Sequence, residues 1–125
     1  MKNICLNLMI AALLMLTSMA YAQERVYVVL DDHDATYNQQ IRKLAAQKWG
    51  TQRVSYISEA AAARVAPDRR TSMLVRKRVG STRRIMLRSM NPQGQLTETE
   101  LSPSNLRPLG RPRVVNDGFR YQPDH

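Results

Sequence analysis

The clearest strand signal in the chain is an unbroken run of five strand-forming residues, Val26 to Leu30. It is followed directly by four polar residues, Asp31, Asp32, His33 and Asp34. Between residues 35 and 50, apolar residues recur at spacings of three and four, which predicts an amphipathic helix. This arrangement is typical of a parallel strand whose carboxyl end carries polar groups, and α/β folds usually place their sites at that end.

The predicted helix has signals at both ends. Thr36 and Gln39 form a capping-box pattern at its start, and Gly50 suits the position just past its last turn. A second strand is predicted over residues 53–58, followed by a short alanine-rich helix over residues 59–65 with a serine before it as its N-cap. Because a helix separates the first two strands, we expect them to run parallel with a right-handed connection.

The second half of the chain predicts a hairpin. Strand patterns over residues 71–78 and 83–90 flank Gly80 and Ser81, which suit a two-residue turn with glycine in the first central position. A second turn signal over residues 91–94 leads to a further edge strand over residues 95–101. Ser102 and Pro103 then predict one helical turn that ends before Pro108.

The element order is strand, helix, strand, short helix, strand, strand (β-α-β-α-β-β), which predicts a small single-domain α/β fold over residues 23–109. This order is compatible with a thioredoxin-like sheet that lacks the redox cysteines. A flavodoxin-like sheet is disfavoured because the second half turns by a hairpin instead of helical crossovers. From Gly110 onward proline, glycine and charge dominate, so we expect residues 110–125 to form a loosely packed or disordered tail.

Residues 1–22 have the pattern of a secretory signal peptide: a basic start, a short apolar run, and small residues at Ala20 and Ala22 before the predicted cut. An uncleaved membrane anchor is the alternative, since residues 4–22 almost reach across a bilayer of about 30 Å. The only cysteine, Cys5, leaves with the signal peptide, so the mature chain has no disulfide and no cysteine metal ligand. We therefore expect an exported protein of the bacterial periplasm, or a secreted one.

The charge of the chain is strongly basic and unevenly distributed. The net charge of +9 becomes +8 when Lys2 leaves with the signal peptide, and residues 64–88 hold nine basic side chains against one acid, Asp68. Arginine outnumbers lysine 15 to 3 after residue 22. This ratio favours fork-like recognition of phosphate or carboxylate, although genome composition is an equally ordinary cause.

The predicted hairpin is the first candidate site. Its turn would place Arg78 opposite Arg83 and Lys77 opposite Arg84, and like charges in such positions destabilise a hairpin. The arrangement makes more sense if an anion, an acidic partner or the acidic loop of this same protein lies near the tip. The candidate partner-binding residues are Arg76, Lys77, Arg78, Arg83, Arg84 and Arg88. Anionic lipid, lipopolysaccharide or an acidic protein would suit the compartment, whereas nucleic acid is disfavoured because no aromatic residues interleave with the arginines. The alternative is a solvated edge whose charges prevent aggregation.

The acidic loop is the second candidate site. Its carboxylates and imidazole suit a metal ion, with further ligands from Ser58, Glu59 or Asp68, but a polar loop with an acid near a helix start is the simpler interpretation. The chain has no complete catalytic motif, phosphate loop or cofactor signature. The patterns favour a non-enzymatic binding domain. A metal-binding or metal-dependent hydrolytic domain using the acidic loop and a structural or assembly accessory of the envelope are the alternatives.

Overall fold

β1 (Arg25–Val29) is an interior strand of the sheet, second from one edge, with a parallel neighbour on each side, as its apolar run predicts. The computed structural model describes residues 24–66 and 68–115, which form a small α/β-like domain with a mixed six-stranded sheet and two helices. The helices are α2 (Ala35–Trp49) and α3 (Glu59–Ala62). The other strands are β2 (Val54–Ile57), β3 (Thr71–Val79), β4 (Thr82–Met90), β5 (Leu96–Leu101) and β6 (Arg113–Val114).

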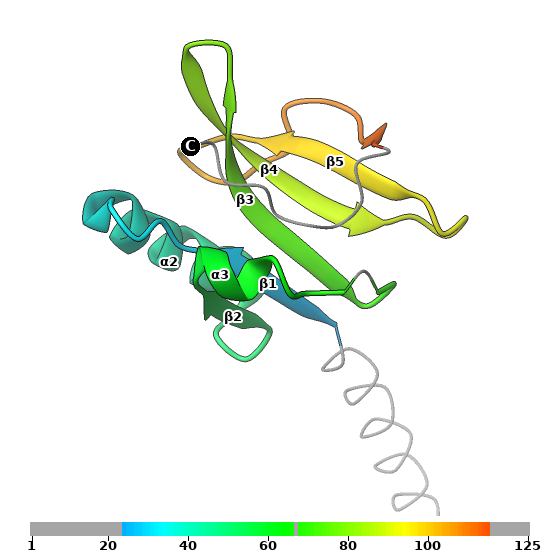
Figure 1. The fold of residues 1–125 in the computed structure, drawn as a ribbon, viewed down its shortest axis with the longest axis horizontal. Coiled ribbons are helices and arrows are strands. Elements are labelled where there is room, and N and C mark those ends of the chain that lie inside the picture. Colours follow the sequence, from blue (N-terminus) through cyan, green and yellow to red (C-terminus); the bar gives the residue numbers. More distant parts are fainter. Residues whose placement is uncertain (1–23, 67, 116–125) are drawn as a thin grey trace, which may run out of the picture.

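The strand order is β2-β1-β3-β4-β5-β6. β1 runs parallel to both β2 and β3, and every later pair is antiparallel. The chain leaves β1 in one direction to reach β2 and returns past it to reach β3, so two connections of the same hand place α2 and α3 on opposite faces. The long β3–β4 hairpin projects beyond the rest of the sheet (Figure 1).

Two apolar clusters follow from this layering, one on each face of the sheet. On the α2 face, Ile41 and Ala45 pack with Val28 and Leu74, all four at most 1% exposed. On the α3 face, Ala62 is in the cluster of Val29 and Met73. Alternation along β1 and β3 sends successive side chains to opposite faces, so both faces of the sheet interior are covered.

The ends of the helices agree with the sequence signals except at one cap. Gly50 lies just past α2 with φ of 83°, and the Ser58 hydroxyl accepts a hydrogen bond from the backbone N–H of Ala61, which confirms both assignments. The predicted capping box at Thr36 is wrong. Asp34 caps α2 instead, because its carboxylate accepts from the backbone N–H of Tyr37 at 3.0 Å.

The predicted hairpin and its register are confirmed. Gly80 has φ of 65°, which its missing side chain permits, and Arg78 pairs with Arg83 across the turn. The following turn is closed by a hydrogen bond of 2.8 Å from the backbone N–H of Asn91 to the carbonyl of Gln95.

The segment after β5 packs against the domain more extensively than the sequence predicts. The backbone N–H of Leu106 donates to the carbonyl of Ser102, one helical turn, and the Leu106 side chain is fully buried against the α2 face. β6 then pairs with β5, and Val115 packs on the α3-face cluster, so β5 is not the edge strand. The rest of the predicted tail, residues 116–125, and the predicted signal peptide lie outside the described residues.

Candidate functional site

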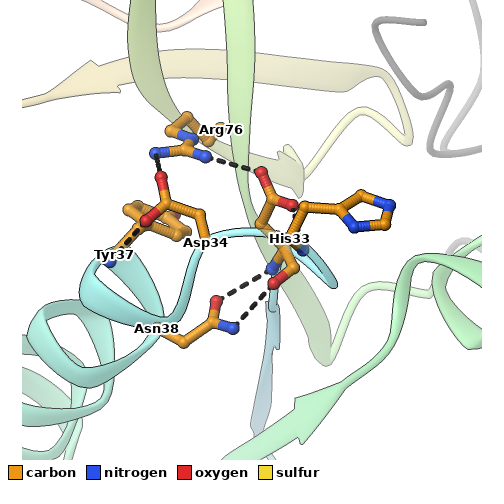
Figure 2. Close-up of polar contacts among 6 residues, drawn as sticks. His33, Asp34, Tyr37, Asn38 and Arg76 are labelled. Atoms are coloured by element: carbon orange, nitrogen blue, oxygen red, sulfur yellow. Dashed lines mark hydrogen bonds and ion pairs between the residues drawn. The ribbon is translucent and has the colours of Figure 1, made fainter.

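The acidic loop and the basic hairpin meet at one side chain, Arg76 (Figure 2). Its guanidinium donates to Asp31 at 2.6 Å and to Asp34 at 3.0 Å, with a different nitrogen for each carboxylate. Arg76 comes from β3, whereas the two aspartates flank the turn between β1 and α2. The parallel pairing of β1 with β3 brings these segments together although they are more than 40 residues apart.

Hydrogen bonds to the backbone hold the loop in shape for this contact. Asp31 accepts from the backbone N–H of His33 at 2.8 Å through its second carboxylate oxygen. The Asn38 side chain, one turn into α2, accepts from the backbone N–H of Asp31 at 2.9 Å and donates to its carbonyl at 2.7 Å. The carboxylates therefore face Arg76 from a loop whose backbone is hydrogen-bonded to the side chains of Asp31 and Asn38.

Tyr37 lies against the Arg76 guanidinium, with the guanidinium carbon 4.0 Å from the ring centroid. This is a cation–π contact, in which the ring covers a face of the guanidinium group while the two carboxylates accept hydrogen bonds from N–H groups at its edges. Burial raises the pKa of Tyr37 to about 12, so the hydroxyl keeps its proton at neutral pH. The hydroxyl is buried without a hydrogen-bond partner among the described residues, which makes Tyr37 a packing residue rather than a base.

The hydrogen bonds that Asp31 and Asp34 accept lower the pKa of both side chains. The largest cause is the backbone N–H that each carboxylate accepts, from His33 for Asp31 and from Tyr37 for Asp34, and the hydrogen bond and positive charge of Arg76 act in the same direction. Both groups are therefore ionised at neutral pH. Two negative charges and one positive charge leave this cluster with a net charge of −1.

These pKa values predict acid sensitivity. The stabilisation is complete above the ordinary aspartate pKa of 3.8 and is lost as the pH falls through the lower folded-state values, because protonation then breaks the contacts with Arg76. We expect the contribution of these two groups to the free energy of unfolding, measured in urea, to hold down to about pH 4 and to fall progressively below it. The double variant Asp31→Asn/Asp34→Asn should show a weaker dependence, and an unchanged pH profile in that variant would contradict the assignment.

The side chains of the acidic loop are arranged differently from what the metal hypothesis requires. Asp32 and His33 are exposed, and the His33 ring points away from Arg76 (Figure 2). Within residues 24–66 and 68–115, no group of three or more histidine, cysteine, aspartate or glutamate side chains could hold a metal ion. Glu59 does line a small cavity beside Asp31, but an ion there would have to displace Arg76 from the carboxylates.

The basic residues of the hairpin divide between two faces. Strand alternation sends Arg76, Arg78 and Arg83 to the α2 face and sends Lys77 and Arg84 to the α3 face. Each face thus carries one pair of like charges in direct cross-strand contact. Arg78, Arg83 and Arg84 are exposed, and they surround a tip that projects from the sheet (Figure 1).

Four of the six candidate partner-binding residues form internal ion pairs, because Lys77 lies 3.7 Å from Glu98 and Arg84 donates to Glu100 at 3.2 Å. The other two, Arg76 and Arg88, are also largely shielded from solvent by theirs. Arg76 holds the aspartates, and its side chain is only 16% exposed. Arg88 is buried and donates to Glu98 on β5 at 3.0 Å. The accessible candidates are therefore Lys77, Arg78, Arg83 and Arg84.

Sequence reasoning missed two basic residues beside the hairpin, Arg111 and Arg113. Both line a groove with Lys77 and Arg84 on the α3 face. They belong to the segment predicted as a tail, and only the pairing of β6 with β5 brings them to the hairpin. Their positive charge was visible in the sequence, but nothing local indicated where it would lie.

Comparison of the chain with protein-family models, with curated proteins and with solved structures gives no match. Among the described residues, no helix has the length and apolar character needed to cross a membrane.

Proposed function

We propose that this protein is a non-enzymatic binding domain of the bacterial envelope whose hairpin contacts an anionic or acidic partner. The observation that supports this most strongly is the pairing of two exposed like charges at the tip, Arg78 opposite Arg83. Lys77 lies opposite Arg84 in the same way, but these two interact with Glu98 and Glu100 of β5. Repulsion across such pairs destabilises a hairpin, and a bound anion relieves it. Arginine forks suit the phosphate or carboxylate groups of such a partner.

The internal ion pairs suggest different roles for the base and the tip of the hairpin. Arg76 connects the base of β3 to the start of α2, and Arg88 connects β4 to β5. These two contacts join the base to its neighbouring elements, whereas Arg78, Arg83 and Arg84 at the tip are exposed to solvent. A rigid base with an exposed charged tip lowers the entropy lost when a partner binds.

Export is part of the same proposal. It depends on the signal-peptide pattern of residues 1–22, and it makes envelope anions such as phospholipid headgroups, lipopolysaccharide phosphates or acidic protein segments the relevant partners. A thioredoxin-like fold that lacks the redox cysteines is part of the proposal as well. It is supported only by the order of the elements.

Charge reversal at the tip tests the proposal. Arg78→Glu/Arg83→Glu should weaken binding to anionic vesicles, lipopolysaccharide or immobilised polyglutamate by at least about tenfold, because each basic residue near an anionic surface contributes roughly 1 kcal/mol. The salt dependence of binding should also become shallower, since fewer charges are screened. Binding is measured by co-sedimentation or retention at several salt concentrations.

The matched control is Lys43→Glu/Arg64→Glu, which makes the same change in net charge at exposed positions on α2 and just after α3. It should bind more tightly than the hairpin variant on every anionic matrix. Equal weakening by both double variants would show that net charge alone governs binding, and unchanged binding by the hairpin variant would eliminate the proposal.

A further inference from the structure

A groove of about 460 Å³ runs along the α3 face between the hairpin and the segment that leads into β6. Two acidic residues and five basic ones line it, and the basic ones include Lys77, Arg84, Arg111 and Arg113. The fifth, Arg78, borders the groove at the hairpin tip, although strand alternation sends its side chain toward the α2 face. The size is within the usual range for ligand-binding clefts.

The acids in this groove are already engaged by neighbouring cations. Glu98 is buried and interacts with Arg88 at 3.0 Å and Lys77 at 3.7 Å, and Glu100 accepts from Arg84 at 3.2 Å. Arg113 lies opposite Glu98 in the β5–β6 register. Within residues 24–66 and 68–115, however, no carboxylate lies within ion-pair distance of Arg113 or Arg111. The groove thus has excess positive charge at its β6 side.

Apolar side chains stand exposed in the same groove. Val79, at the tip of the hairpin, is 41% exposed, and Leu109, in the loop before β6, is 58% exposed. Val79, Leu109 and Val114 are the large hydrophobic side chains that stand exposed in the described part of the chain, so two of the three line this groove. Exposed apolar groups beside arginines are the combination that suits the interface of a bilayer, where the apolar groups enter the acyl boundary and the cations contact headgroup phosphates.

We infer that this groove is the surface by which the protein docks on an anionic phospholipid bilayer, with Val79 and Leu109 at the acyl boundary and Arg111 and Arg113 on the headgroup phosphates. The inference deepens the proposed function, because it selects one face of the hairpin and one class of partner. A soluble polyanion has no apolar layer and would leave Val79 and Leu109 in water. The bilayer surface satisfies both the charge and the apolar character of the groove.

The test uses the mature protein and two kinds of vesicle, phosphatidylcholine alone and phosphatidylcholine with phosphatidylglycerol. The wild type should bind only the vesicles that contain phosphatidylglycerol. Val79→Ser/Leu109→Ser, which keeps every charge, should weaken this binding by about tenfold through lost apolar insertion. Arg111→Gln/Arg113→Gln should weaken it by a similar factor, about tenfold.

The control Lys43→Gln/Arg64→Gln removes the same charge as the Arg111/Arg113 variant and should bind these vesicles within about twofold of the wild type, since both sites lie off the groove. Retention on polyglutamate separates the two proposals: the Val79/Leu109 variant should retain the wild-type value. If the Val79/Leu109 variant also binds vesicles like the wild type while Arg78→Glu/Arg83→Glu weakens binding, the bilayer inference is wrong and the hairpin proposal stands. If neither the groove variants nor the hairpin variant binds less, both are wrong.

Discussion

Arg88→Met is expected to lower the free energy of unfolding by about 3 to 5 kcal/mol, because it removes the closest partner of a buried carboxylate. The Glu98 side chain is 1% exposed, and the Arg88 side chain that donates to it is 6% exposed. Lys77, at 3.7 Å and on a side chain that is 42% exposed, is too distant and too hydrated to replace the lost contact. Urea unfolding at neutral pH measures the change.

Replacing Glu98 together with Arg88 shows whether the loss of stability comes from the missing ion pair or from the missing side-chain volume. Arg88→Met/Glu98→Leu removes both charges and replaces them with apolar side chains, so its stability should return to within about 1 kcal/mol of the wild type or exceed it. Glu98→Leu alone should cost less than Arg88→Met, since Arg88 lies nearer to solvent. A double variant as unstable as Arg88→Met would contradict this explanation and would indicate that packing, not charge, sets the effect.

Arg76→Ala should lower the free energy of unfolding by about 2 to 3 kcal/mol, between the values for surface and buried ion pairs. Its partners are partly solvated, with Asp31 at 23% and Asp34 at 33% side-chain exposure, which reduces the cost of leaving them unpaired. Repulsion between the two carboxylates and loss of the contact with Tyr37 add to the effect. Urea unfolding again provides the measurement.

Two variants refine this prediction. Arg76→Lys keeps the positive charge but cannot contact both carboxylates with a planar fork, so its stability should lie between those of Arg76→Ala and the wild type. Asp34→Asn keeps the helix cap and removes one of the two negative charges, so adding it to Arg76→Ala should recover part of the loss. If Arg76→Lys is as stable as the wild type, the fork geometry contributes nothing measurable.

The two ion pairs differ in the role that their geometry allows. Arg76 lies where the hairpin meets the loop after β1, so its loss should loosen the orientation of the hairpin as well as the fold. Arg88 lies between β4 and β5 and interacts with the carboxylate that also faces the groove. Removing Arg88 with Glu98 leaves the net charge of the chain unchanged, but it takes away the carboxylate that lies 3.7 Å from Lys77 and so makes the groove more positive.

Much of the fold follows from local patterns. The run Val26 to Leu30 predicts a central strand because it is apolar on both faces, and β1 lies between two parallel neighbours. Gly80 predicts the hairpin register because it supplies the positive φ that a two-residue turn needs. These features depend on residues close together in the chain, so the sequence alone was sufficient.

The wrong helix cap at Thr36 and the missed strand β6 depend on contacts between residues far apart in the chain. Both Asp34 and Thr36 satisfy local rules for a helix start, and the contact of Asp34 with Arg76, from a distant strand, favours the earlier position. β6 has only two residues and little strand character of its own. Its pairing depends on the open edge of β5 and on burial of Val115 against the α3-face cluster.

The sequence by itself determined the order of the elements from β1 to β5, the hairpin register and the concentration of positive charge in residues 64–88. Only the tertiary structure decided which of those charges remain available. Strand order and pairing across the sheet bring Arg76 to the aspartates, Arg88 to Glu98, and Arg111 with Arg113 to the hairpin. The physical reason is that ion pairing depends on distances of a few ångströms between residues far apart in the chain, and the packing of the sheet sets those distances.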